Sequence, residues 1–288
     1  MSPLALALVL TGAVLHATWN LTAKRAAGDD SLAFVWLMGL VSVALALPVG
    51  VASWSVQPPS LSPPAWVAVV ASGAVHGVYF LLLQHGYRRG DLSLVYPVAR
   101  GTGPLFAVAA AVIVLGEQPG RTGWLGIAAV LAGIVLVSGI TQATGGPGQL
   151  ASVVWGVLTG LWIATYTLID AWAVTRLGLG PLVFFFLSLL FSALVLAPFA
   201  LRDTAALRRQ WRENRRAIIT VGIVSPVAYV LVLFALRLAP LAYVAPLREL
   251  SMMVAVLYGA WLLHERVSAR RLAGVACMIA GVVGLALA

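Results

Sequence analysis

Long apolar stretches follow one another along almost the whole chain, separated by short segments that contain charged residues, glycine or proline. The stretches cover residues 3–26, 31–53, 65–87, 93–115, 122–141, 151–174, 181–201, 216–237, 241–262 and 269–287. A helix of about 20 apolar residues spans the hydrocarbon core of a bilayer. The stretches do not alternate with period two, and in lipid only helices and closed barrels satisfy their backbone groups. The pattern therefore predicts an all-α integral membrane protein with ten transmembrane helices.

The composition agrees with this prediction. Of the 288 residues, 61% are hydrophobic and 9% are charged, and the mean hydropathy is +1.00. Soluble domains contain about 25% charged residues, so this chain does not provide a water-facing surface. The composition therefore argues against a soluble enzyme, a nucleic-acid-binding domain and a disordered protein. The single cysteine, Cys277, also excludes a disulfide framework and a multi-cysteine metal site.

Lysine and arginine residues are distributed unevenly between the connecting segments. Of the 18, 13 follow the odd-numbered stretches, whereas three follow the even-numbered ones. By the positive-inside rule the odd-numbered connections are cytoplasmic, so both termini are predicted to face the other side of the membrane. The formal charge of +9 is thus interpreted as orienting the chain, not as binding nucleic acid.

The two halves of the chain resemble each other at a nearly constant offset. Residues 17–21, Ala-Thr-Trp-Asn-Leu, align with residues 164–168, Ala-Thr-Tyr-Thr-Leu, 147 positions later. Further matches at offsets of 148 and 149 pair Arg88 with Arg237, Pro97 with Pro246, Arg100 with Arg248 and Glu117 with Glu265. Each half has five stretches, an odd number, so we expect two inverted repeats over 1–144 and 145–288. Inverted repeats with a site at their interface are typical of secondary transporters.

Residues 86–97, Gly-Tyr-Arg-Arg-Gly-Asp-Leu-Ser-Leu-Val-Tyr-Pro, with Leu-Gly-Glu at 115–117, resemble the EamA domain of the drug/metabolite transporter superfamily. The second half repeats the pattern, ending in Leu-His-Glu at 263–265. Within the superfamily the chain is most similar to bacterial amino-acid exporters of the YddG type. The resemblance implies a basket-like bundle in the bacterial inner membrane, with periplasmic termini on the charge count above. Helices 1, 3, 4, 6, 8 and 9 would enclose a central cavity, with helices 5 and 10 outside.

Two arginines at equivalent positions of the repeat lie at membrane depth. Arg248 has Glu249 beside it and Asp170 near the outer end of the sixth stretch, whereas no acidic residue falls at the predicted depth of Arg100. A guanidinium keeps its charge, so Arg100 either binds a substrate carboxylate or has a structural or gating role. Arg248 is expected to form an outer-gate ion pair with Glu249 or Asp170. Pro226, in the middle of the eighth stretch, is expected to break its helix and contribute to gating.

Aromatic and small polar residues near the middle of several stretches form a second group. They either pack helices together or line a cavity with aromatic walls for a solute of amino-acid size. With the second interpretation, the substrate-binding residues are His16, Trp19, Asn20, His76, Tyr79, Tyr96, Arg100, Trp162, Tyr166 and Ser225. The histidines have no clustered carboxylates or thiols beside them, so no metal site is predicted. They are candidates for proton carriers or for neutral hydrogen-bond partners.

The sequence therefore favours a secondary transporter that works by alternating access, and the resemblance to YddG-type exporters implies that it exports aromatic or neutral amino acids or similar small metabolites. One alternative is export of drugs or lipid-linked and other metabolites on the same fold. A second is an intramembrane enzyme, although the sequence lacks a nucleophile with its base. No cofactor is expected, and no Walker motif is present to supply ATP drive. We expect a monomer whose partners are the solute and membrane lipid; proton exchange and facilitated diffusion both remain open.

Overall fold

The structure is a computed structural model that describes residues 1–26, 31–56, 58, 61–89, 92–138, 149–254, 256 and 268–288. Side chains are described for these residues except 24–26, 31, 83–89, 92–94, 96–97 and 149. The described chain forms helices α1 (Pro3–Ala26), α2 (Ser31–Val56), α3 (Pro63–Arg89), α4 (Leu92–Ile113), α5 (Arg121–Ser138), α6 (Gln149–Thr175), α7 (Pro181–Ala200), α8 (Thr204–Leu236), α9 (Leu241–Arg248) and α11 (Ala269–Leu287). No strand occurs among these residues, and the predicted all-helical fold is confirmed.

Most of the helices can cross a membrane by length and composition. Eight helices in the described ranges are long and apolar enough, and the two that fall short are α4 and α9. Val98–Ile113 is a shorter apolar segment within α4, and α9 has eight residues before the turn at Glu249. The chain is therefore a multi-pass membrane protein.

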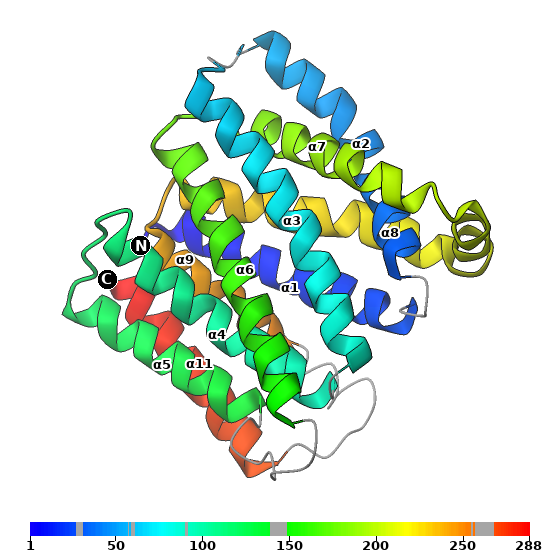
Figure 1. The fold of residues 1–288 in the computed structure, drawn as a ribbon. Helices are drawn as coiled ribbons and strands as arrows, with labels where there is room; N and C mark the ends of the chain where they lie inside the picture. The colour runs from blue at the N-terminus through cyan, green and yellow to red at the C-terminus, as the bar shows by residue number, and fades with distance from the viewer. Residues whose placement is uncertain are drawn as a thin grey trace.

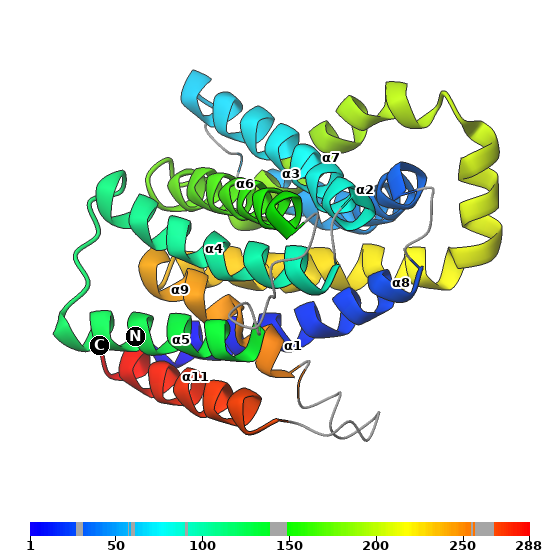
Figure 2. The same ribbon diagram turned by 60° about the horizontal axis from the view of Figure 1, so that its bottom comes forward.

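Helix contacts repeat between the two halves. Helix α1 packs on α8 as α6 packs on α3, and α2 packs on α8 as α7 packs on α3. Helices in corresponding places also meet, because α2 packs on α7, α4 on α9 and α5 on α11. Figures 1 and 2 show α5 and α11 side by side at the edge of the bundle, near both chain ends. The Met1 ammonium donates a hydrogen bond to the Ala286 carbonyl at 3.2 Å, so the termini lie on the same face.

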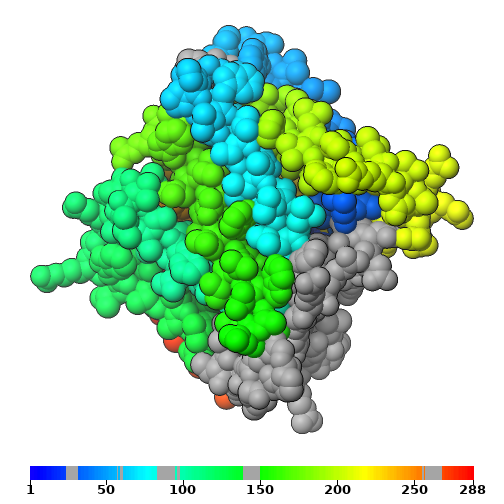
Figure 3. All heavy atoms as spheres, in the orientation of Figure 1, coloured from blue at the N-terminus to red at the C-terminus, as the bar shows by residue number. Residues whose placement is uncertain are grey.

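The other edge of the molecule belongs to different helices. In the space-filling view of Figure 3, α2, α3 and α7 form the upper and right-hand part, and the arginine-rich start of α8 projects beyond them. The chain ends and this arginine-rich arm thus lie on opposite sides of the bundle in Figure 1.

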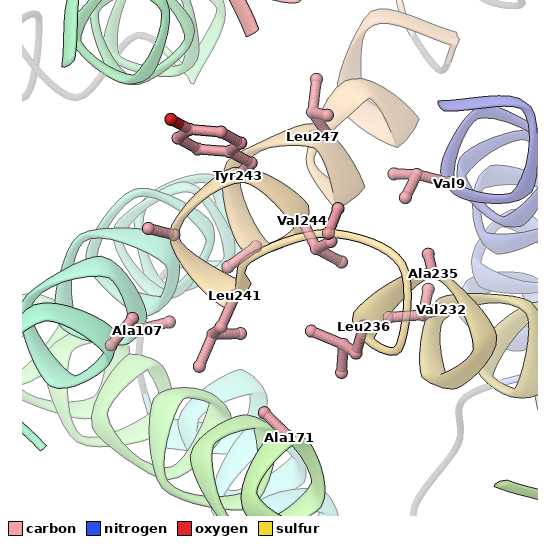
Figure 4. Close-up of a cluster of buried hydrophobic side chains, with 14 of the residues drawn as sticks. Val9, Ala107, Ala171, Val232, Ala235, Leu236, Leu241, Tyr243, Val244 and Leu247 are labelled. Carbon is pink, nitrogen blue, oxygen red and sulfur yellow. The ribbon is translucent and has the colours of Figure 1, made fainter. Parts of the chain in front are cut away.

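Helix α9 lies in the middle of the largest hydrophobic core. All of its residues are buried. In Figure 4, Leu241, Val244 and Leu247 lie among side chains that α1, α4, α6 and α8 contribute. The N-terminus of α9 is capped by Glu117, whose two carboxylate oxygens accept the N–H groups of Leu241 and Ala242, each at 2.8 Å. The cap satisfies two backbone donors that a helix start leaves unpaired, and its negative charge suits the helix dipole.

The connection that the sequence predicted over 201–216 is instead largely helical. Asp203 Oδ1 accepts the N–H of Ala206 at 2.8 Å and caps the start of α8. The helix bends at Asn214, where φ is −120° and ψ is 16°. Ala206 and Gln210 are buried, whereas the arginines are exposed. The prediction was wrong here because charged residues exclude a lipid-spanning helix but allow an amphipathic one outside the lipid.

The expected helix break at Pro226 is absent. Helix α8 stays helical at Pro226, and the Gly222 carbonyl, which loses its helical donor there, accepts a hydrogen bond from Ser42 Oγ at 2.8 Å. An interruption occurs instead in the ninth predicted stretch, where Glu249 adopts turn geometry after α9. Residues 250–254 are helical again, and the stretch beyond 256 lies outside the described residues.

Glycines bring α5 and α11 into close contact. A Cβ at Gly133 would lie 2.7 Å from the Gly274 carbonyl oxygen, closer than such atoms approach. We expect Gly133→Ala to force these helices apart, cost about 1–3 kcal/mol of stability, and lower the unfolding temperature in detergent. Gly120→Ala is the control, because a Cβ there meets no atom within 4 Å. Equal unfolding temperatures for the two variants would contradict this packing.

Candidate functional site

A central cavity lies between the two halves and holds about 110 Å³ of free space. One water molecule needs about 10–15 Å³ by the same measure, so several waters or a small solute fit. Side chains from α1, α3, α4, α6, α8 and α9 line it, as the resemblance implied. Helices α2 and α7 line it as well, which corrects that implication. Within the described residues, α5 and α11 contribute nothing to the lining.

Arg100 on α4 forms a buried ion pair with Glu249. The Arg100 Nη1 donates to both Glu249 carboxylate oxygens, at 3.1 and 3.2 Å, and Nη2 contacts His16 Nε2. Arg100 is 5% exposed and Glu249 is 2% exposed. The expectation that Arg100 has no acidic neighbour was wrong. Because the chain turns at Glu249, this side chain reaches α4 instead of following Arg248 along α9.

Arg248 has neutral partners where an ion pair was expected. Its Nη1 donates to Thr167 Oγ1 and its Nη2 donates to the Tyr166 hydroxyl, each at 3.2 Å. The guanidinium carbon lies 5.2 Å from the ring centre of Tyr229. In the part of the chain that the structure describes, Arg248 makes no ion pair. The predicted pairing of Arg248 with Glu249 or Asp170 is therefore corrected, although both arginines line the same cavity.

Asp170 lies behind the cavity wall. It is fully buried, and its Oδ2 accepts a hydrogen bond from the Tyr229 hydroxyl at 2.5 Å. His76 Nε2 is 3.9 Å from the same oxygen. His76 Nδ1 lies 2.9 Å from the Ser72 carbonyl, which can only accept, so Nδ1 carries the hydrogen and Nε2 faces Asp170. Asp170 thus holds Tyr229, and the Ser72 carbonyl holds His76; both of these side chains line the cavity.

Aromatic rings form one continuous wall beside Arg248. The ring centres of His76 and Tyr166 are 4.1 Å apart, and those of Tyr79 and Tyr166 are 5.4 Å apart. Tyr229 joins them at 5.4 Å from His76 and 5.1 Å from Phe185. Such a wall binds apolar groups over its faces and hydrogen-bonds polar groups with its hydroxyls.

The structure brings together most of the residues that the sequence singled out. Those that line the cavity are His16, Trp19, His76, Tyr79, Arg100, Tyr166, Ser225, Pro226 and Arg248. Glu249 and Asp170 lie behind the lining, and Asn20 and Trp162 are not part of it. Trp162 packs against the cluster of Tyr79, Ile163 and Tyr166. The side chain of Tyr96 lies outside the described residues.

Sequence reasoning missed several lining residues. Phe80 and Tyr229 both line the cavity and are 149 positions apart, so the repeat alignment contained the signal that would have found them. Trp36 of α2 and Phe185 of α7 are likewise 149 positions apart, whereas other lining residues of these two helices, among them Met38 and Ser192, carry no such signal. These two helices are apolar all round, so their sequence does not show which face meets the cavity.

Comparison with known proteins places the chain among transporters. The model of the EamA-like transporter family matches residues 3–139 and 150–287. The spermidine export protein MdtI of Enterobacter sp. (strain 638) is 32% identical over 72 residues, which is 25% of this chain. The chain spans about 65% of the length of that relative. The crystal structure of another protein has a similar fold, with a TM-score of 0.78 at 17% sequence identity. The match covers 98% of this chain and 96% of that protein's chain.

The fold, the cavity between the two halves and the comparisons all indicate the same class of protein. The crystal structure shares the fold of the whole described bundle, and the family model covers both five-helix halves. Proteins of this family are transporters, not enzymes. The chain belongs to the EamA-like transporter family.

Proposed function

We propose that the protein exports aromatic or other neutral amino acids, or similar small zwitterionic metabolites, by alternating access. It acts as a secondary transporter in the bacterial inner membrane, with both termini in the periplasm and with inverted halves over 1–144 and 145–288. The helix contacts that repeat between the halves support this arrangement. The adjacent termini also agree with it, because an even number of crossings returns the chain to its starting side.

The burial of Arg248 at the cavity, with neutral hydrogen-bond partners, is the observation that supports this proposal most. It lines the cavity at 9% exposure, and its hydrogen bonds go to the neutral hydroxyl groups of Thr167 and Tyr166. A guanidinium keeps its charge when buried, and a buried charge is costly without an opposite one. A solute carboxylate in the cavity supplies that charge and matches the planar fork of donors. The carboxylate site is therefore proposed at Arg248, with Arg100 held by Glu249.

The charges around the cavity favour a solute without net charge. Among the described residues, the buried carboxylates Glu249 and Asp170 equal the two arginines in number, but only Arg100 forms an ion pair with one of them, Glu249. The two arginines face the cavity, whereas the two carboxylates lie behind the lining. A zwitterion brings no net charge into this balanced site, and its carboxylate meets the side of the cavity that carries the cations.

Export of a polyamine is the second candidate function. The relative that matches part of the chain is a spermidine exporter. Aromatic rings such as those of Tyr79, Tyr166 and Tyr229 bind cations over their faces. Against this candidate, no described carboxylate lines the cavity. A polycation would therefore lack the facing negative charges that it needs.

Counterflow into proteoliposomes tests both candidates. Vesicles with purified protein are loaded with an unlabelled solute, and uptake of labelled phenylalanine, alanine or spermidine is measured with and without a pH gradient. We expect counterflow of the amino acids but not of spermidine, and none in protein-free vesicles. Counterflow of spermidine alone would overturn the amino-acid proposal. An effect of the pH gradient on the final accumulation would distinguish proton exchange from facilitated diffusion.

A further inference from the structure

The cavity has a second wall opposite the arginines. Helix α2 packs against α3, α7 and α8, whereas Arg100 and Arg248 come from α4 and α9. Figures 1 and 2 show α2 and α9 in different parts of the bundle. The α2 side of the lining consists of Val35, Trp36, Met38, Gly39 and Ser42, and Leu196 from α7 belongs to the same buried cluster as Val35 and Met38. The arginines thus lie in one part of the lining, and the part around Gly39 is uncharged and mainly apolar.

Gly39 leaves open space in this apolar wall. A Cβ built on Gly39 would meet no atom within 4 Å. At Gly12, the other glycine of the lining, a Cβ would lie 3.1 Å from the Ala228 carbonyl oxygen. Gly12 therefore allows close contact between α1 and α8, which is the usual role of glycine in membrane helices. Gly39 has no such contact, so its missing side chain only enlarges the cavity.

The residues around Gly39 are held in place. Trp36 Nε1 donates to the Ala193 carbonyl of α7 at 3.0 Å. Met38 and Leu196 belong to one buried cluster with Val35. Ser42, one turn beyond Met38, is fixed by its hydrogen bond to the Gly222 carbonyl. A wall fixed in this way is preorganised for a ligand group of matching shape.

We propose that Gly39, Val35, Trp36, Met38 and Leu196 form a subsite for the apolar side chain of the transported solute. The proposal rests on the proposed function, in which Arg248 binds the carboxylate at the opposite wall. The open space at Gly39 admits a large apolar or aromatic side chain. The subsite thereby makes the transporter selective for side-chain size.

Substitution of Gly39 tests the subsite. In Gly39→Leu the new side chain enters the cavity, and we expect the ratio of phenylalanine to alanine counterflow to fall at least about tenfold, as for other size-restricted pockets. Gly39→Ala should give an intermediate ratio. Gly120→Leu, at an exposed position outside the lining, should leave the ratio unchanged. An unchanged ratio in Gly39→Leu, or an equal loss of both fluxes in Gly39→Ala, would overturn the subsite.

A second measurement does not depend on transport. In a Cys277→Ser background, which removes the only native cysteine, Gly39→Cys should react with a small thiol reagent. Phenylalanine should slow this reaction more than alanine does. Failure of the thiol to react, or equal protection by both amino acids, would overturn the subsite. Absence of amino-acid counterflow in the wild-type protein would instead overturn the proposed function, and the subsite with it.

Discussion

Arg248→Ala should reduce amino-acid counterflow by about 30-fold or more. The change removes the guanidinium that binds the solute carboxylate, while Thr167 and Tyr166 keep their positions on α6. Removing one partner of a buried, hydrogen-bonded charge pair costs about 2–5 kcal/mol, and each 1.4 kcal/mol is about tenfold in affinity. Arg248→Lys keeps the charge but loses the planar fork, so its counterflow should lie between those of the wild type and Arg248→Ala.

Counterflow is compared at equal amounts of protein in the vesicles, with Arg212→Ala as the matched control. Arg212 is exposed on the arm of α8 that precedes the bend at Asn214, so its loss should leave counterflow unchanged. Protection against thermal unfolding by phenylalanine gives an independent measure of binding, and Arg248→Ala should lose it. Wild-type counterflow and protection in Arg248→Ala would place the carboxylate elsewhere.

Helix positions were predictable from the sequence because the lipid imposes both length and composition. The stretch predicted over 151–174 corresponds to α6, which begins at Gln149 and ends at Thr175. The hydropathy pattern did not predict the helix outside the lipid, where the bilayer sets neither helix length nor composition. The start of α8 is determined by the cap at Asp203 and the bend at Asn214, and neither depends on hydropathy.

The sequence predicted which residues belong to the candidate site, but not which of them contact one another. The repeat places Arg100 and Arg248 at equivalent positions, and both line the cavity. The equivalence ends one residue later, where Gly101 corresponds to Glu249. A depth along the membrane normal cannot show which helix a side chain faces. The turn at Glu249 and the contact of α9 with α4 determine that this carboxylate binds Arg100.

Breaking the buried ion pair of Arg100 with Glu249 should strongly reduce the stability of the fold. We expect Glu249→Ala to lower the free energy of unfolding by about 3–5 kcal/mol, because it removes the carboxylate from a buried guanidinium. The loss should appear as a lower unfolding temperature in detergent. Glu249→Gln keeps an acceptor for the Arg100 hydrogen bonds but not the charge, so its loss should be smaller.

A double variant distinguishes the cost of an unpaired charge from the value of the pair itself. Replacing both partners with apolar residues, Arg100→Met with Glu249→Leu, leaves no buried charge and should recover most of the stability lost in Glu249→Ala. Glu213→Ala, which removes an exposed carboxylate on the arm of α8, is the control and should unfold like the wild type. If Glu249→Ala also unfolded like the wild type, the ion pair would not stabilise the bundle. If the double variant were no more stable than Glu249→Ala, the loss would come from side-chain packing at Glu249, because charge removal would then have recovered nothing.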